Sequence, residues 1–555
     1  MGSQVSISID SILEIIVRND VEYAWEYFLK SDFTGFVEGK TFSDLCEGFF
    51  IKESSKMFSF LRFSIMKIEL MISNGDYMQI VTNSNLRLFL SILAEFLKFS
   101  KEKSLYCDDF LNKCNDHDND YYYYSEYDDG FVIDTSSSLY NRLWNLCVYL
   151  LFVNGFSVSS DDQPWILLND LPNASMNRKS VIKCIINLTM YNESFIITDF
   201  PLEDIYVSIC NLTTDFVHSY EDEVVNEVDK SLLKVSYVLL SILFLRYSSF
   251  EQDMSSINGN YVLNSLHGSI SNSNPIVLSS KYPLYIESMT YVYVSLMSVP
   301  YLVQSLGESG CSNSFIASLL RLFHYTLTIS SLNYFHTILI SCILKIIENS
   351  LCAVSLNAPY LDQFDSTLCA HRGSYADLLI EILLTYSHYD VLVSSIVSVL
   401  HQIAYHINDT SLFISCKILA FFETLIGNGT NSSNIKVIDL FLEFLARTVQ
   451  RTETCNQNLC LMIVTKAKLF KSLHKTHKMC TESLNRIISY VNYIRKRIQQ
   501  VYSSKNIESD LVLQIILQTK TEEIFFWPKE FENHPHVFGG KMEEQWIKWN
   551  LVFIK

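Results

Sequence analysis

Apolar and polar residues recur along this chain with the period of an amphipathic α-helix, and the pattern is clearest between Asn434 and Gln450. Polar residues return there at spacings of three and four, at Lys436, Asp439, Glu443, Arg447 and Gln450. The residues between them are mainly Ile, Val, Leu and Phe, so we expect one narrow polar stripe to face water. The other sides of such a helix are covered by neighbouring helices.

Similar periods predict helices along most of the sequence. A helix begins near Thr410, where Asp409 can act as N-cap, and ends at Gly427, which can adopt the left-handed conformation. The other predicted helices are 11–29, 56–73, 84–99, 137–154, 176–190, 229–248, 284–299, 314–328, 333–350, 375–387, 389–407, 457–473 and 479–503. Short linkers predict antiparallel hairpins, so the expected fold is all-α, an armadillo- or HEAT-like α-solenoid of degenerate helical hairpins without a fixed period.

We expect a single helical-repeat domain over residues 1–555, with two stretches that depart from the pattern. Residues 107–130 carry eight acidic residues, one Lys and a run of four Tyr, which predicts an acidic, Tyr-rich loop or disordered insertion. Residues 249–281 are rich in Ser, Asn and Gly, and they predict a crossover between two helical stacks.

Composition supports this fold and excludes several others. Only 16 Gly and 9 Pro occur in 555 residues, which disfavours a many-stranded β-fold because its turns need these residues. The net charge of −18 disfavours a nucleic-acid partner, and 14 Cys without regular pairs favour reduced thiols in the cytosol. The most apolar runs, 146–153 and 238–245, are too short to span a bilayer, and no secretory signal opens the chain.

No catalytic or metal-binding motif is complete in this sequence. Neither G-x-G-x-x-G nor a P-loop is present, and the segment 307–311 has Cys where a nucleophile elbow needs Gly. His474, His477 and Cys480 have helical spacing, but no fourth ligand is evident and a solvated helix face explains them better. His534 and His536 stand without a partner cluster. We therefore expect no enzyme activity, metal, cofactor or small-molecule substrate.

Two features suggest a mechanism. The first six residues fit M-G-x-x-x-[ST], so Gly2 is a candidate for N-myristoylation with Ser6 aiding recognition; a chance match is the alternative. The segment 466–497 carries nine cations opposed only by Glu482, and an ordinary solvated helix surface is its alternative reading. The cations that we expect to contact a membrane or an acidic partner are Lys466, Lys468, Lys471, Arg495, Lys496 and Arg497.

One myristoyl chain binds membranes only marginally, with an association constant of about 10⁴ M⁻¹, so stable attachment needs a second signal. No Cys precedes Cys46, which argues against a neighbouring palmitoyl group. The second signal would then come from a folded surface or a protein partner.

Several segments resemble the high-temperature-induced dauer-formation protein family, which is related to dymeclin. The segment 372–380 is similar to that family's G-T-H-A-D-L-L-I, and 456–459 followed by 466–470 resembles its N-x-N-L…[KR]-x-[LI]-F. Weaker similarities cover 176–178, 356–360 and the ending 549–555, in family order. Family members usually carry a long low-complexity insertion after the basic segment, which is short here. The residues of these motifs expected to have structural roles are Gly373, Ser374, Asp377, Asn456, Asn458 and Trp549.

The resemblance implies a myristoylated peripheral protein on the cytosolic face of Golgi and trans-Golgi network membranes. It further implies trafficking proteins as partners and a non-catalytic scaffold role in vesicle trafficking and secretory cargo sorting. The alternative is a soluble helical-repeat adaptor that binds peptide or protein cargo, as nuclear transport factors do. A groove lined by regularly spaced Asn and Trp would favour this alternative. The six Trp of the chain show no such period. An enzyme on a helical scaffold is a third possibility.

Overall fold

The computed structural model describes residues 9–18, 20–31, 40–73, 84–102, 138–151, 174–191, 227–246, 285–298, 300–326, 333–360, 373–388, 390–427, 432–450, 456–476, 482–501 and 509–518. These residues are almost entirely α-helical and include no β-strand, which confirms the all-α class. An isolated bridge pairs Pro359 with Ser374. Within these same residues, no helix has both the length and the apolarity that crossing a bilayer requires.

The chain divides into two compact units. Unit 1 comprises Met1–Gly268 together with Phe538–Lys555, and unit 2 comprises Ser269–Val537. The boundary falls within the stretch 249–281, for which we predicted a crossover. The acidic stretch 107–130 lies outside the described residues.

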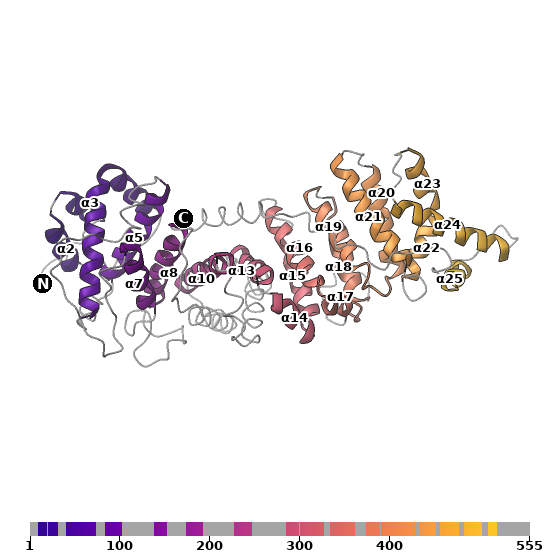
Figure 1. Ribbon diagram of the computed structural model, residues 1–555, viewed down its shortest axis with the longest axis horizontal. Coiled ribbons are helices and arrows are strands. Elements are labelled where there is room, and N and C mark those ends of the chain that lie inside the picture. The colour runs from indigo at the N-terminus through magenta and orange to yellow at the C-terminus, as the bar shows by residue number, and fades with distance from the viewer. Residues whose placement is uncertain are drawn as a thin grey trace. The chain divides into compact units, whose positions relative to one another are not determined.

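Unit 1 is built around two central helices (Figure 1). Its helices are α1 (Ile9–Arg18), α2 (Val21–Lys30), α3 (Lys40–Ser73), α5 (Ser84–Glu102), α7 (Leu139–Leu151), α8 (Ala174–Tyr191) and α10 (Glu227–Arg246). Helix α3 contacts α1, α2 and α5, and α8 contacts α5, α7 and α10. Cross-links from α8 to α5 help to fix their register, because Asn187 Nδ2 donates to Ala94 O at 3.1 Å and Cys184 Sγ donates to Leu90 O at 3.0 Å.

The predicted helix 11–29 is wrong in one respect, because two helices occupy this range. Helix α2 has its own N-cap, Asp20, whose Oδ1 accepts a hydrogen bond from the Tyr23 N–H at 2.8 Å. Helix α3 begins sixteen residues before the predicted 56–73, at Lys40, and Glu53 interrupts it with non-helical φ/ψ of −137° and 42°. The predicted helix 56–73 coincides with the part of α3 that follows Glu53.

An aromatic cluster joins α2, α3 and α5. Trp25 stacks on Phe28 with centroids 5.8 Å apart and meets the edge of Phe89 at 6.4 Å, while Phe28 meets Phe60 at 6.2 Å. All four rings are buried. Aromatic side chains bury large apolar areas, so this cluster anchors the N-terminal hairpin on α3 and α5.

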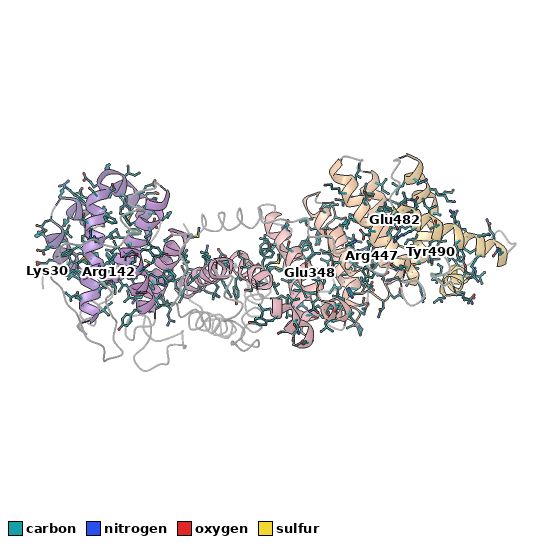
Figure 2. All side chains as sticks on the ribbon, in the orientation of Figure 1. Lys30, Arg142, Glu348, Arg447, Glu482 and Tyr490 are labelled. Atoms are coloured by element: carbon teal, nitrogen blue, oxygen red, sulfur yellow. The ribbon has the colours of Figure 1, made fainter. Side chains whose placement is uncertain are left out.

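A buried ion pair connects α3 to α7. Arg142 donates from Nε to Glu69 Oε1 at 3.3 Å and from Nη2 to Glu69 Oε2, with side chains only 6% and 1% exposed. Figure 2 labels Arg142 inside unit 1. Burial raises the pKa of Glu69, and the hydrogen bond and charge of Arg142 offset only part of that rise. Each charge therefore depends on the other to remain buried.

Unit 2 consists of two rows of helices. One row is α13 (Tyr285–Ser298), α16 (Asn333–Ile347), α19 (Asp390–Ile403), α21 (Ser432–Gln450) and α24 (Glu482–Val501). The other is α15 (Ser312–Thr326), α18 (Tyr375–Thr385), α20 (Leu412–Gly427), α22 (Gln457–Thr465) and α25 (Ser509–Leu517). Each helix contacts the next in its row, and contacts such as α15 with α16 and α20 with α21 join the rows (Figure 1). The short helices α14 (Pro300–Glu308), α17 (Ser350–Ser355) and α23 (Ala467–Thr476) complete the unit.

Several predicted boundaries in unit 2 need correction. The predicted helix 457–473 is two helices, α22 and α23, separated at Lys466. Asp409 does not cap α20, because Ser411 Oγ accepts from the Ile414 N–H at 3.3 Å and the helix starts at Leu412. Gly427 is the last helical residue and is not left-handed; among the described glycines only Gly310 has positive φ, at 71°.

The polar stripe of α21 is largely covered, contrary to our expectation. Arg447 is 4% exposed, and its Nη2 donates to Glu443 Oε1 at 2.8 Å, while His401 Nε2 of α19 lies 3.3 Å from the same oxygen. The Arg447 guanidinium also lies 4.7 Å from the Tyr405 ring centroid. Burial raises the pKa of Glu443, but His401 and Arg447 outweigh it and hold that pKa below its usual value. Contacts of α21 with α19 and α24 cover the stripe, and Figure 2 labels Arg447 there.

His336 of α16 is a buried neutral histidine. Its Nε2 lies 3.1 Å from Thr326 Oγ1, which donates to Leu322 O, so the imidazole acts as donor to Thr326. The edge of its ring meets Phe323 at 5.6 Å. Burial lowers the pKa of His336 to about 4, and the contact with Thr326 offsets part of that effect.

We expect Arg142→Met to lower the free energy of unfolding by about 3–5 kcal/mol, because it leaves Glu69 charged and unpaired in the core. Urea unfolding of the full chain measures the change. Arg18→Met is the matched control, since Arg18 pairs with Glu14 at an exposed site and contributes about 0–1 kcal/mol. Equal effects of the two substitutions would contradict a buried pair.

His336 makes stability depend on pH below neutrality. The unfolded chain takes up a proton near pH 6.5, whereas the folded chain does so near pH 4, so stability is lost as pH falls between these values. The full loss is about 3 kcal/mol. His336→Gln keeps a donor toward Thr326 but does not titrate. Urea unfolding at stepped pH should give a shallower slope for the variant; identical slopes would exclude His336 as the cause.

Candidate functional site

The two predicted lipidation residues, Gly2 and Ser6, lie outside the described residues, which begin at Ile9 in α1. Trp549, His534 and His536 also lie outside them, as do His477 and Cys480. Of the basic segment, residues 466–476 and 482–497 are described, without the side chains of 475 and 476, and the remaining motif residues are described as well.

Lys468 and Lys471 lie on the outward face of α23 because the apolar residues of this helix are used for packing. Ala467, Phe470 and Leu473 are buried, and Phe470 stacks on Phe422 of α20 with centroids 5.9 Å apart. Lys468 and Lys471 fall between these positions and are exposed. The helical period therefore separates the packed face of α23 from a basic face.

The same separation holds along α24. Its buried residues are Leu484, Ile487, Tyr490, Val491, Ile494 and Ile498. Lys496 is exposed, while Arg495 and Arg497 are half-buried at the edges of the packed stripe. The Arg497 guanidinium lies 5.9 Å from the Tyr493 ring centroid on the same helix, so part of its side chain covers that ring.

Lys466 differs from the other predicted contact residues, because its Nζ donates to Glu423 Oε1 of α20 at 2.7 Å. Both side chains are 40% exposed, so this pair is a surface salt bridge between α20 and the α22–α23 junction. Arg486 likewise pairs with Glu482, one turn earlier on α24. Among the described residues, no salt bridge engages Lys468, Lys471, Arg495, Lys496 or Arg497. These five cations define what we call the basic face.

The motif residues around Ser374 form a buried polar junction. Ser374, for which the sequence predicts a structural role, is the N-cap of α18, with its Oγ accepting from the Asp377 N–H at 3.2 Å. Asp377 Oδ1 accepts from the Ser411 N–H at 3.2 Å, which ties the start of α18 to the start of α20. Burial raises the pKa of Asp377, while N–H groups of Ser411 and Ser374 lower it in part. A Cβ on Gly373 would stand 2.5 Å from Asp377 Oδ2, so a larger residue here would displace the Asp377 carboxylate.

The motif asparagines hold the loop 406–411 between α19 and α20. Asn456, with φ of 62°, donates from its backbone N–H to Asn408 O at 2.6 Å and from Nδ2 to Ile407 O at 3.1 Å. Asn458 Nδ2 donates to Thr410 O at 2.8 Å, and Asn357 Nδ2 donates to His406 O at 2.7 Å. Motif blocks that are distant in sequence therefore meet at one loop, and their role here is structural.

Two charged features were not predicted. The network of His401, Glu443 and Arg447 has one sequence signal, the spacing of four between Glu443 and Arg447, but burial could not be inferred from it. Arg178 of α8 is 4% exposed, and its Nε and Nη2 have no hydrogen-bond partner among the described residues. Burial alone lowers the pKa of Arg178 to about 9, so its charged form is costly at this position.

The structure also shows where the incomplete metal-binding and catalytic motifs lie. His474 is exposed on α23, and within the described part of the chain no three His, Cys, Asp or Glu side chains cluster as metal ligands. The segment 307–311 is the junction of α14 and α15, so a helix precedes it rather than the strand that a nucleophile elbow requires.

No protein-family model matches this chain. No curated protein matches its sequence either.

We expect Asp377→Ala to lower the free energy of unfolding by about 2–3 kcal/mol, because the N–H groups of Ser411 and Ser374 would lose their acceptor in a buried place. Asp377→Asn is the matched control, since its amide oxygen can still accept from Ser411 while the buried charge disappears. Its expected loss is about 1 kcal/mol or less. Urea unfolding distinguishes the two, and equal losses would show that the hydrogen bonds do not carry the effect.

Proposed function

We propose that this protein is a non-catalytic, peripheral scaffold that attaches to cytosolic membrane surfaces through an acylated Gly2 and a second contact at the basic face. The observation that carries the proposal is the basic face itself. Among the residues that the structure describes, α23 and α24 carry five cations without a salt-bridge partner, in a chain whose net charge is −18. A cluster of this sign attracts anionic lipid at about 1 kcal/mol per cation near the surface.

The two attachments support one another physically. A single myristoyl chain binds reversibly and weakly, and cations near an anionic leaflet supply the additional binding that stable residence needs. The contact is also sensitive to salt, since exposed charges are screened beyond about 8 Å at physiological ionic strength. A protein with this arrangement cycles between cytosol and membrane.

The scaffold role is favoured by the helical rows. In this proposal the two rows of unit 2 extend as an armadillo- or HEAT-like α-solenoid, in which each helix pair contacts only its neighbours and long side surfaces remain for partners. The assignment to Golgi and trans-Golgi membranes, with a role in vesicle trafficking and cargo sorting, comes from the family resemblance alone.

The first test is Gly2→Ala in the full chain produced together with an N-myristoyltransferase. Sedimentation with vesicles of phosphatidylcholine and phosphatidylserine should fall by at least about ten-fold, because the buried acyl chain is lost. Unchanged sedimentation would refute the lipid role. It would favour the soluble adaptor instead.

The basic face is tested on the same vesicles with Lys468→Glu, Lys471→Glu and Lys496→Glu combined. Binding should weaken and lose most of its salt dependence, because the exposed cations that meet the anionic lipid are reversed. Lys436→Glu, which reverses one cation instead of three, is the control, since Lys436 is exposed on α21 and is not one of the five residues of the basic face. If the control weakens binding as much as the triple variant, overall charge rather than this face is responsible.

A further inference from the structure

The outward face of the second half of α3 has an unusual composition. Its positions at helical spacing are Lys56, Ser59, Phe63, Met66, Lys67 and Leu70. At 100° per residue these six side chains fall within an arc of about 100°. Met66 and Leu70 are 42% and 43% exposed, and Phe63 and Lys67 are half-buried. A water-facing stripe on a surface helix is ordinarily polar, so two exposed large apolar residues one turn apart are unexpected.

Apolar packing within unit 1 does not account for these residues. The opposite side of the same segment supplies the core, with Met57, Phe60, Leu61, Ile65, Ile68 and Ile72 all buried. The outward stripe contains no carboxylate. Glu69, next to Leu70 in the sequence, is buried and pairs with Arg142. In a chain of net charge −18 this stripe is locally cationic as well as apolar.

The two lysines flank the apolar side chains. Lys67 Nζ lies 5.1 Å from the Phe63 ring centroid, so its amino group is held over the ring beside Met66. Lys56 Nζ donates to Val17 O of α1 at 2.6 Å, which fixes α1 against this end of the stripe. Such a surface suits the boundary between lipid headgroups and acyl chains, because the apolar side chains can enter the acyl layer while the cations contact the headgroups.

The stripe also lies within reach of the acylation site. Helix α1 contacts α3 and begins at Ile9, seven residues after Gly2. Seven extended residues span at most about 25 Å, so a lipid on Gly2 enters the bilayer no farther than this from the start of α1. Figure 1 shows α3 as the long helix of unit 1.

We infer that the stripe of α3 docks on an anionic membrane surface, with Phe63, Met66 and Leu70 entering the interfacial region and Lys56 and Lys67 meeting lipid phosphates. This inference rests on the proposed function and deepens it, because it places a membrane contact in the same unit as Gly2. The basic face of unit 2 is a separate contact.

The experiment uses the acylated full chain and two vesicle types, phosphatidylcholine alone and phosphatidylcholine with phosphatidylserine. Met66→Ser combined with Leu70→Ser should reduce the partition coefficient on the anionic vesicles by at least about ten-fold. The matched control is Leu351→Ser combined with Val354→Ser, an apolar pair on α17 of unit 2 that is 53% exposed at both positions. The control should bind as the unaltered chain does.

Lys67→Gln tests the charge separately. It should reduce binding to anionic vesicles several-fold and leave binding to phosphatidylcholine unchanged. Because the substituted side chains are exposed or half-buried, circular dichroism and thermal unfolding should match the unaltered chain. A misfolded double variant would be replaced by Met66→Gln alone, which keeps the size of the side chain.

The outcomes separate this inference from the proposal on which it rests. If Gly2→Ala abolishes binding while the Met66 and Leu70 variant binds fully, the stripe is not a membrane contact and the acylated scaffold stands. If that variant instead alters self-association in size-exclusion chromatography without altering binding, the stripe contacts a second copy and the inference is overturned. If the acylated chain without substitutions binds neither vesicle type, both the proposed function and the membrane contact of the α3 stripe are refuted.

Discussion

Buried polar groups at helix starts need hydrogen-bond partners, and this constraint organises unit 2. A helix start leaves backbone N–H groups without intrahelical acceptors, so bringing several starts together is costly unless each N–H is satisfied. Ser374 Oγ meets this need at the start of α18, and Asp377 Oδ1 meets it at the start of α20. Asn456 holds the loop that precedes α20. The register between neighbouring helices of a row therefore depends on a few polar contacts in addition to apolar packing.

The charged side chains of the core differ from those on two surfaces of the protein. Inside, Glu69 with Arg142 and Glu443 with Arg447 are paired, because an isolated buried charge is far more costly than a buried pair. Outside, the basic face of unit 2 and the outward stripe of α3 carry cations for which the described residues show no salt-bridge partner. The chain as a whole is strongly acidic, so these two surfaces are where an anionic partner would meet the least repulsion.

Contacts between residues close together in the sequence could be predicted, whereas contacts between different helices could not. The Ser374 cap was predictable because it involves residues three positions apart, and the exposure of Lys468 and Lys471 followed from their spacing between apolar residues. The pairing of Lys466 with Glu423 was not predictable, because the two residues come from different helices. For the same reason Asp409 was wrongly assigned as a cap when Ser411 stood nearer the helix.

The sequence by itself determined the helical class, most of the helices and the alternation of packed and polar faces, because these depend on spacings within a single helix. Only the tertiary structure decided which polar faces meet water. The stripe of α21 is predicted to face water, yet α19 and α24 cover most of it, whereas Met66 and Leu70 of α3 are apolar and exposed. Periodicity reports which residues share a face, whereas the neighbours that cover that face come from distant parts of the chain.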